Sequence, residues 1–175
     1  LLLLVNCGDL YIDKENNVAK LAKTGQMVDL GGIAKGYAGD EAINIYKKYG
    51  ITSAYINLGG NVVTLGAKPD GTPWRIGIQN PRDLTGKYVG VVEVVNKAVI
   101  TSGDYERYIE VNDKRYHHII DPKTGYPAES GLISTTIITG SSIMGDALST
   151  AVFVLGLEKG MELVESLDDV ECIFI

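Results

Sequence analysis

The sequence predicts an α+β domain in which two or three helices pack on a mainly antiparallel sheet. Many short runs rich in β-branched and aromatic residues are separated by turn residues, a pattern typical of hairpins. Two longer runs carry apolar residues at helical spacing. Runs of hairpins with a few separated helices are typical of the α+β class. Because repeats and low-complexity linkers are absent, we expect residues 1–175 to form a single domain.

The composition is that of a globular protein without a basic surface. The 175 residues suffice for one domain with a real core, and 45% are hydrophobic and 22% charged. The net charge of −6, from 16 Lys and Arg against 22 Asp and Glu, argues against a nucleic-acid partner, which requires a basic face. An anionic small ligand would therefore need a local device, such as a metal ion, a lysine or a helix start.

The first helix is predicted over residues 33–49, with Gly50 as its C-cap. A β-like entry at Val28-Asp29-Leu30 leads into Gly31-Gly32, so bare backbone, the Asp29 carboxylate and Lys35 lie together at the helix start. A helix start with free N–H groups favours an anion such as phosphate. The spacing matches neither a P-loop nor a dinucleotide-binding fingerprint.

Strands follow along the middle of the chain. Turn residues and alternating apolar residues predict them at 54–58, 62–65, 74–79, 89–95, 98–101, 105–111, 115–120 and 132–139. We expect 89–95 and 98–101 to form a hairpin around Asn96-Lys97. A second hairpin is expected to join 105–111 and 115–120.

A second helix is predicted over 142–155, followed by a short helix over 157–167 and a final strand. Both ends of the chain, Leu1–Val5 and 171–175, resemble cuts through strands, so we expect the C-terminal part of a longer protein. Leu1–Val5 is too short to span a bilayer and has no charged flank. Any export signal would lie outside the sequence.

The two cysteines, Cys7 and Cys172, lie in apolar, strand-like contexts and match no metal-binding spacing. We expect buried free thiols, because free cysteine usually packs as a small hydrophobic residue. A disulfide between them is the alternative.

Asp146 and Thr150 lie four residues apart on the second predicted helix and therefore share one face. A carboxylate and a hydroxyl are hard oxygen ligands that suit Mg²⁺, which retains positions for water and phosphate. In the alternative interpretation, Asp146 complements the helix dipole and Thr150 bonds back to a carbonyl.

His117 and His118 are adjacent on a predicted strand, so they point to opposite faces and cannot both bind one metal ion from one side. We expect one histidine to pack and the other to face a cleft. The alternative is a plain strand and turn with one histidine satisfied in the core. Two further loops, 101–105 and Gly59-Gly60-Asn61, carry weaker signals, and a tight turn alone explains the second.

Six motifs, taken in order, resemble the ApbE-type FAD:protein FMN transferases. The matching runs are 29–38, 56–61, 74–81, 101–108, 118–127 and 146–151. The resemblance implies an ApbE-like, T-fold-like domain whose N-terminal half, which supplies further flavin contacts, is missing here. We therefore expect residues 1–175 alone to bind FAD weakly or not at all.

The resemblance implies that FAD is cut with Mg²⁺ as cofactor, that FMN is attached to a Thr or Ser of a partner protein, and that AMP leaves. It also implies roles for individual residues. The backbone oxygen of Gly32, with Asp146 and Thr150, would hold Mg²⁺; Asp29, Lys35 and the backbone at Ile120 would contact FAD; and His118 would transfer a proton. Asp146 thus counts as both metal ligand and catalytic residue. We place Asp104 beside the cofactor as a second candidate proton acceptor.

At Gly32 relatives often have Ala or Ser, which a backbone ligand tolerates, and some have Glu at the position of Lys35. Two other functions stay open: a Mg²⁺-dependent FAD pyrophosphatase, with water as nucleophile, and a non-catalytic flavin-binding protein. Relatives act outside the cytoplasm, often as membrane-tethered lipoproteins, on redox-pump subunits. The resemblance therefore implies an extracytoplasmic location and an acceptor of that kind.

Overall fold

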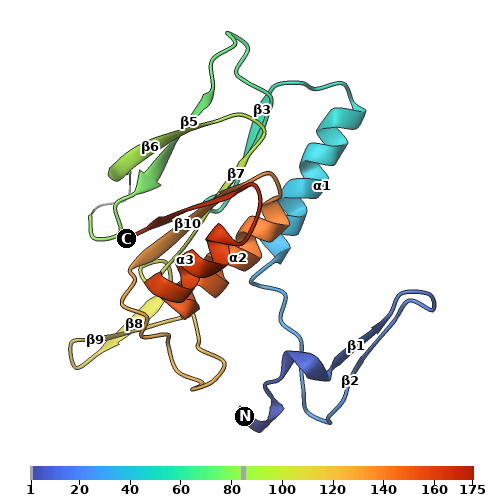
Figure 1. The fold of residues 1–175 in the computed structure, drawn as a ribbon, viewed down its shortest axis with the longest axis vertical. Helices are drawn as coiled ribbons and strands as arrows, with labels where there is room; N and C mark the ends of the chain where they lie inside the picture. The colour runs from blue at the N-terminus through green and yellow to red at the C-terminus, as the bar shows by residue number, and fades with distance from the viewer. Residues whose placement is uncertain (1, 84–85) are drawn as a thin grey trace.

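A computed structural model describes residues 2–83 and 86–175 and has the predicted α+β architecture (Figure 1). Its centre is a five-stranded antiparallel sheet in the order β11-β10-β7-β4-β3. The strands are β3 (Ala54–Leu58), β4 (Asn61–Leu65), β7 (Ala98–Gly103), β10 (Ser134–Thr139) and β11 (Val170–Phe174). The final predicted strand is therefore confirmed.

One face of this sheet is covered by α1 (Ala34–Lys48), α2 (Ser142–Leu155) and α3 (Leu157–Glu165). Ile43 of α1 packs against Val63 and Ile100, whereas α2 and α3 pack around Ile137. The predicted helices are confirmed to within a few residues at their ends. Apolar residues that recur at helical spacing lie on one side of each helix. There they pack against every second residue of the strands, which point to the same face of the sheet.

The opposite face carries the hairpin of β5 (Trp74–Gln79) and β6 (Tyr88–Val94). The predicted hairpin between 89–95 and 98–101 is wrong, because β6 pairs with β5, and β7 pairs with β4 and β10. Val94 and Val99 meet face to face in a core cluster, so the intervening turn joins two layers. Asn96 makes this turn with a φ of 55°, and its side chain accepts a hydrogen bond from Gly66 N at 2.7 Å.

The second predicted hairpin is confirmed as β8 (Tyr108–Val111) and β9 (Lys114–His117). Asn112 and Asp113 both have positive φ, 51° and 60°, as a two-residue type I′ turn requires. Beyond His117 the chain leaves the hairpin, and Ile120 forms an isolated antiparallel bridge with Pro127.

Most of the N-terminal segment lies apart from the sheet and the three helices (Figure 1), although the Leu2 side chain lies close to Gly125. It consists of two short 3₁₀ helices, Leu2–Leu4 and Cys7–Asp9, and a hairpin of β1 (Leu10–Asp13) and β2 (Val18–Leu21). The predicted strand over Leu1–Val5 is wrong from Leu2 onward, and Leu1 lies outside the described residues. A local hydrogen bond makes this segment a 3₁₀ helix instead of a strand, because Val5 N donates to Leu2 O at 3.0 Å.

Both cysteines are free thiols, as predicted, but their environments differ. Cys172 is half-buried on β11. Cys7 is exposed, against expectation, because it lies in a 3₁₀ helix that no sheet covers. In the described part of the chain no helix has the length and apolarity needed to cross a membrane.

Candidate functional site

The Asp146 carboxylate lies where α1, α2 and β4 meet. Asp146 is only 5% exposed; its Oδ2 accepts a hydrogen bond from Gly36 N at 2.8 Å and its Oδ1 accepts one from Asn61 Nδ2 at 2.9 Å. Asn61, itself 1% exposed, accepts a bond from Lys35 Nζ at 3.1 Å through its Oδ1. The structure therefore joins the start of the first helix, with Lys35 and Gly36, and Asp146 of the second helix in one hydrogen-bonded group.

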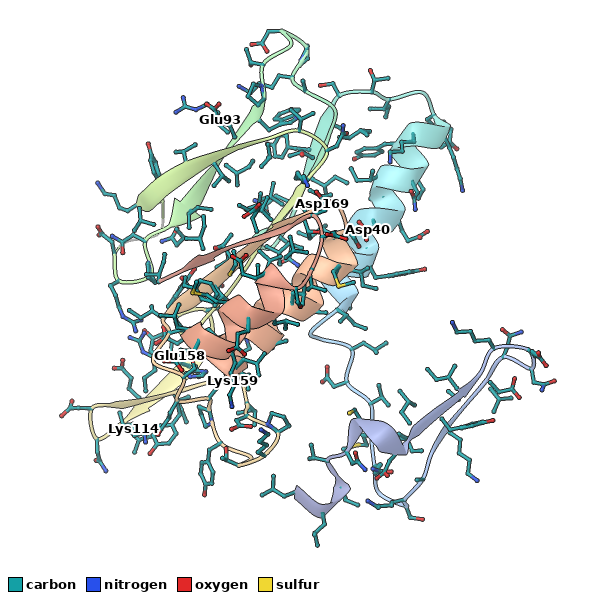
Figure 2. All side chains as sticks on the ribbon, in the orientation of Figure 1. Asp40, Glu93, Lys114, Glu158, Lys159 and Asp169 are labelled. Atoms are coloured by element: carbon teal, nitrogen blue, oxygen red, sulfur yellow. The ribbon has the colours of Figure 1, made fainter. Side chains whose placement is uncertain are left out.

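A close contact between α1 and α2 sets this geometry. A Cβ on Gly36 would lie 2.4 Å from the Ser142 carbonyl oxygen and 2.7 Å from Ile143 Cα, so glycine alone permits the approach. One turn later Asp40, labelled in Figure 2, accepts hydrogen bonds from Ser142 N at 2.8 Å and Ile143 N at 3.0 Å. Asp40 thus caps α2 from the neighbouring helix and fixes the two helices relative to each other.

The start of α1 differs from the free anion seat that the sequence predicted. Ala34 N donates to the Leu30 carbonyl, and Gly36 N donates to Asp146. These N–H groups are thus already satisfied by the protein. The first turn of α1 therefore already holds a carboxylate of the protein, that of Asp146.

The same arrangement frees the Gly32 carbonyl. In a regular helix Gly36 N would donate to the residue four positions earlier, which is Gly32. Because Gly36 N donates to Asp146, no hydrogen bond within residues 2–83 and 86–175 uses the Gly32 oxygen. A Cβ at Gly32 would meet nothing within 4 Å, so Ala or Ser fits there as well.

Thr150 follows Asp146 by one helical turn, but it does not bond back to the Asp146 carbonyl. Ser149 Oγ donates to that carbonyl at 3.0 Å. Thr150 Oγ1 lies instead 3.2 Å from Ser102 Oγ on β7, which is also 2.9 Å from Ser149 Oγ. The alternative in which Thr150 only satisfies its own helix is therefore not what the structure has.

The chemistry of these donor groups is the kind that suits a magnesium ion. Each carboxylate oxygen of Asp146 accepts one hydrogen bond and keeps a further lone pair. A carboxylate, a hydroxyl and an unused carbonyl are the hard oxygen ligands that Mg²⁺ takes. Among the described residues no group of three or more His, Cys, Asp or Glu side chains forms a metal cluster.

Asp104 lies in a separate charged cluster. Arg82 binds it through two hydrogen bonds of 2.7 Å, Nη1 to Oδ1 and Nη2 to Oδ2, and Arg115 Nη1 lies 3.5 Å from Oδ1. The bidentate pair raises the pKa of the Arg82 guanidinium above its ordinary value. Both oxygens of Asp104 thus accept from arginine side chains, and a role as proton acceptor would use the lone pair that remains on Oδ2.

One histidine packs and the other is exposed, as predicted, but the hollow beside this strand is lined by the packed His117 and not by His118. His117 is 9% exposed, its Nε2 lies 3.2 Å from the Ala128 carbonyl, and its ring packs edge-on against Phe153. His118 is exposed, and its Nδ1 lies 3.2 Å from the Arg107 carbonyl. A carbonyl can only accept, so Nδ1 of His118 donates in this contact, and Nε2 is the atom that offers a lone pair when the ring is neutral.

The structure does not join all the predicted residues. Asp29 is exposed and accepts a hydrogen bond from Gly31 N at 2.6 Å, and Ile120 is 46% exposed. In the part of the chain that is described, no hydrogen bond or ion pair links Asp29, Ile120, His118 or Asp104 to the Asp146 group. These residues remain predictions for the cofactor and the proton transfer.

Four residues at these sites were not singled out from the sequence: Asn61, Ser102, Arg82 and Arg115. Asn61 was interpreted as a turn residue after paired glycines. Its near-complete burial at the head of β4 is the signal of its role, and that signal is visible only in the fold. Ser102 stood in a loop of small polar residues whose partners lie on another element.

Two surface hollows lie elsewhere. One of about 280 Å³ is bordered by Asp40, Lys47 and Lys97, and another of about 440 Å³ by Arg115, His117 and Asp121. Neither is lined by Asp146 or Thr150, so the candidate site is identified by its hydrogen bonds and not by a cavity.

The chain was compared with known proteins. A model of the ApbE family matches residues 1–174. A protein from Klebsiella pneumoniae named FAD:protein FMN transferase is 38% identical over 167 residues, covering 95% of this chain and 51% of the relative. One of the same name from Treponema pallidum is 40% identical over 167 residues, covering 91% and 46%.

Solved structures agree. An ApbE protein from Thermotoga maritima superimposes with a TM-score of 0.90 at 37% identity, over 99% of this chain and 56% of that one. The apo flavinyl transferase ApbE from Pseudomonas stutzeri gives a TM-score of 0.81 at 38% identity, over 99% and 52%. This chain spans about half the length of the relatives it matches. With a family model over nearly all of its residues, the chain belongs to the ApbE family.

Proposed function

We propose that the full-length protein transfers FMN from FAD to a Thr or Ser hydroxyl of an acceptor protein, with release of AMP. Family membership and the names of the relatives support this reaction. The observation that carries it is the hydrogen-bonded group around Asp146, in which a buried carboxylate and a lysine share the amide of Asn61. A cleaved pyrophosphate needs a cation site and positive charge side by side.

In this proposal the Gly32 carbonyl, Asp146 and Thr150 hold Mg²⁺. Bound there, the ion supplies charge neutralisation for the pyrophosphate and the departing AMP. Gly36 N and Asn61 keep the Asp146 carboxylate in position through one hydrogen bond to each oxygen. Lys35 adds a positive charge that Asn61 holds next to this carboxylate.

His118 is proposed to take the proton of the acceptor hydroxyl. Its Nδ1 is tied to the Arg107 carbonyl, which orients the ring and leaves Nε2 as the basic atom. Asp104 is the second candidate for this role, through the lone pair that remains on its Oδ2 beside Arg82. Asp29 and the backbone at Ile120 are proposed FAD contacts.

A Mg²⁺-dependent FAD pyrophosphatase would use the same residues, with water in place of the acceptor hydroxyl. A non-catalytic flavin-binding protein is the third possibility. The presence of Asp146, Thr150 and His118 in one chain argues against it, because a binding protein has no need of both a metal ligand set and a base. The nucleophile alone separates the first two functions.

We also propose that the protein acts outside the cytoplasm on a redox-pump subunit. Both statements rest on the resemblance to the family. Labelling of the full-length protein in intact cells with a membrane-impermeant reagent tests the location. Protection from the reagent until the cells are lysed would contradict it.

The reaction is tested by incubating the full-length protein with FAD, Mg²⁺ and an acceptor that carries Asp-x-x-[Ser/Thr]-Gly-Ala-Thr. FMN fixed on the acceptor supports the transferase, free FMN and AMP indicate the pyrophosphatase, and intact FAD indicates a binding protein. Asp146→Asn should abolish turnover, since it removes the charge of the ligand. Glu158→Gln, an exposed carboxylate on α3 seen in Figure 2, is the matched control and should retain it.

A further inference from the structure

We propose that Ser102 is a positioning residue that fixes the direction of the Thr150 hydroxyl, so that the lone pairs of Thr150 remain free for the metal ion. The inference rests on the proposed function, because it assumes that Thr150 is a metal ligand. It goes further by naming the residue that prepares Thr150 for that role.

The direction of the hydroxyl chain follows from counting hydrogens, starting at Ser149. A serine or threonine hydroxyl has one hydrogen to donate and two lone pairs with which to accept. Ser149 Oγ donates to the Asp146 carbonyl at 3.0 Å, because a carbonyl oxygen can only accept. Ser149 must therefore accept in its 2.9 Å contact with Ser102 Oγ, and Ser102 donates there.

Counting hydrogens in the same way shows that the Thr150 hydroxyl is a donor to Ser102. Ser102 has spent its hydrogen on Ser149, so in its 3.2 Å contact with Thr150 Oγ1 it can only accept, and Thr150 donates. The hydrogen of Thr150 thus points at β7. The lone pairs of its oxygen are left for another partner, and a hydroxyl that ligates Mg²⁺ must offer such a lone pair.

Burial makes this direction difficult to reverse. Ser149 is fully buried, and Ser102 is half-buried on the face of β7 that α2 covers. If the chain were reversed, Ser149 would give up its hydrogen bond to the Asp146 carbonyl. The reversed chain therefore makes one hydrogen bond fewer in a buried place, so the order from Thr150 to Ser102 to Ser149 is the stable one.

Thr101 provides a matched control on the same strand. Its Oγ1 lies 2.8 Å from Thr136 Oγ1, a hydroxyl pair of the same kind between β7 and β10. Because neighbouring strand residues alternate, this pair lies on the face covered by the β5–β6 hairpin, away from α2.

The test measures binding of Mn²⁺, as a paramagnetic substitute for Mg²⁺, to the full-length protein without FAD by electron paramagnetic resonance. Ser102→Ala should weaken Mn²⁺ binding by about three- to tenfold, the range expected from one hydrogen bond. Ser102→Thr, which keeps the hydroxyl, should restore it. Thr101→Val should leave it unchanged. Ser102→Cys, which keeps the volume but is a poor hydrogen-bonding partner, replaces Ser102→Ala if alanine lowers the unfolding temperature.

The outcomes separate this inference from the function on which it rests. If Thr150→Val weakens binding and the Ser102 variants do not, the role of Ser102 is overturned and the metal site stands. If Thr150→Val binds Mn²⁺ like the wild type, the ligand set of the proposed function fails, and the inference fails with it. Equal losses in Ser102→Ala and Thr101→Val would indicate a general structural effect and also overturn the role of Ser102.

Discussion

Replacing Gly36 by alanine tests the junction on which the candidate site depends. In an exposed helix the substitution would stabilise the protein by about 1 kcal/mol, because alanine has the higher helix propensity. Here the new Cβ would lie 2.4 Å from the Ser142 carbonyl oxygen and 2.7 Å from Ile143 Cα. Both are backbone atoms, so they cannot move aside as a flexible side chain would.

The expected loss of stability combines two destabilising effects with the gain in helix propensity, which opposes them. Overpacking of this kind costs about 1–3 kcal/mol. Moving α1 away from α2 also weakens the hydrogen bond from Gly36 N to the buried Asp146 carboxylate, and bonds to charged groups are worth about 1.5–3 kcal/mol. After subtracting the gain in helix propensity, we expect a net loss of about 2–4 kcal/mol in the free energy of unfolding.

Thermal unfolding of the full-length protein measures this loss. A loss of 1 kcal/mol lowers Tm by about 2–4 °C in a domain of 150–250 residues and by less in a longer chain, so Tm of the full-length protein should fall by several degrees. Gly32→Ala is the matched control for stability, because its Cβ meets nothing within 4 Å, and its Tm should stay within about 2 °C. A Gly36→Ala protein as stable as Gly32→Ala would refute the argument that the helices approach through this glycine.

Three further substitutions or reactions are predicted. Asn61→Leu should lower the free energy of unfolding by about 1–3 kcal/mol in urea titrations, because it leaves the Asp146 Oδ1 without its donor; an unchanged midpoint would show that water replaces the amide. His117→Leu should destabilise by a similar amount, about 1–3 kcal/mol, through the loss of its bond to Ala128, whereas His118→Ala should change stability by less than about 0.5 kcal/mol; equal effects on the two unfolding midpoints would contradict the difference in burial. Burial raises the pKa of the Cys172 thiol to about 12, so iodoacetamide at pH 8 should leave its peptide unmodified in mass spectra of the native protein, and rapid modification there would show that β11 opens.

The elements of the fold were largely predictable because their signals are local. The apolar residues of α1 and α2 recur at helical spacing, and Asn112-Asp113 marks a tight hairpin by itself. The pairing of β6 and β7 was not predictable in the same way. Asn96-Lys97 suits either a hairpin or a turn between layers, and the choice is made by burial of Val94 against Val99.

In the candidate site, too, the residues with a local signal were predictable and their distant partners were not. Asp146 and Thr150 lie four residues apart on one helix, so their shared face could be predicted from spacing alone. Their partners come from other elements: Asn61 lies 85 positions from Asp146, and Ser102 lies 48 positions from Thr150. No local pattern marks such pairs, because only the folded sheet brings β4 and β7 under α2.

Asn61 explains how opposite charges can coexist at this junction. A lysine in direct contact with Asp146 would neutralise the carboxylate and compete with a cation for its oxygens. Within the described residues no ion pair joins Lys35 to Asp146; the Asn61 amide lies between them, accepting from the lysine at 3.1 Å and donating to the carboxylate at 2.9 Å. Gly36 N, which holds the other oxygen, carries no formal charge. The negative charge of Asp146 is therefore positioned but not cancelled, and Lys35 keeps its own charge for an anion. A site that holds a cation and a pyrophosphate together, as proposed here for the full-length protein, needs this separation.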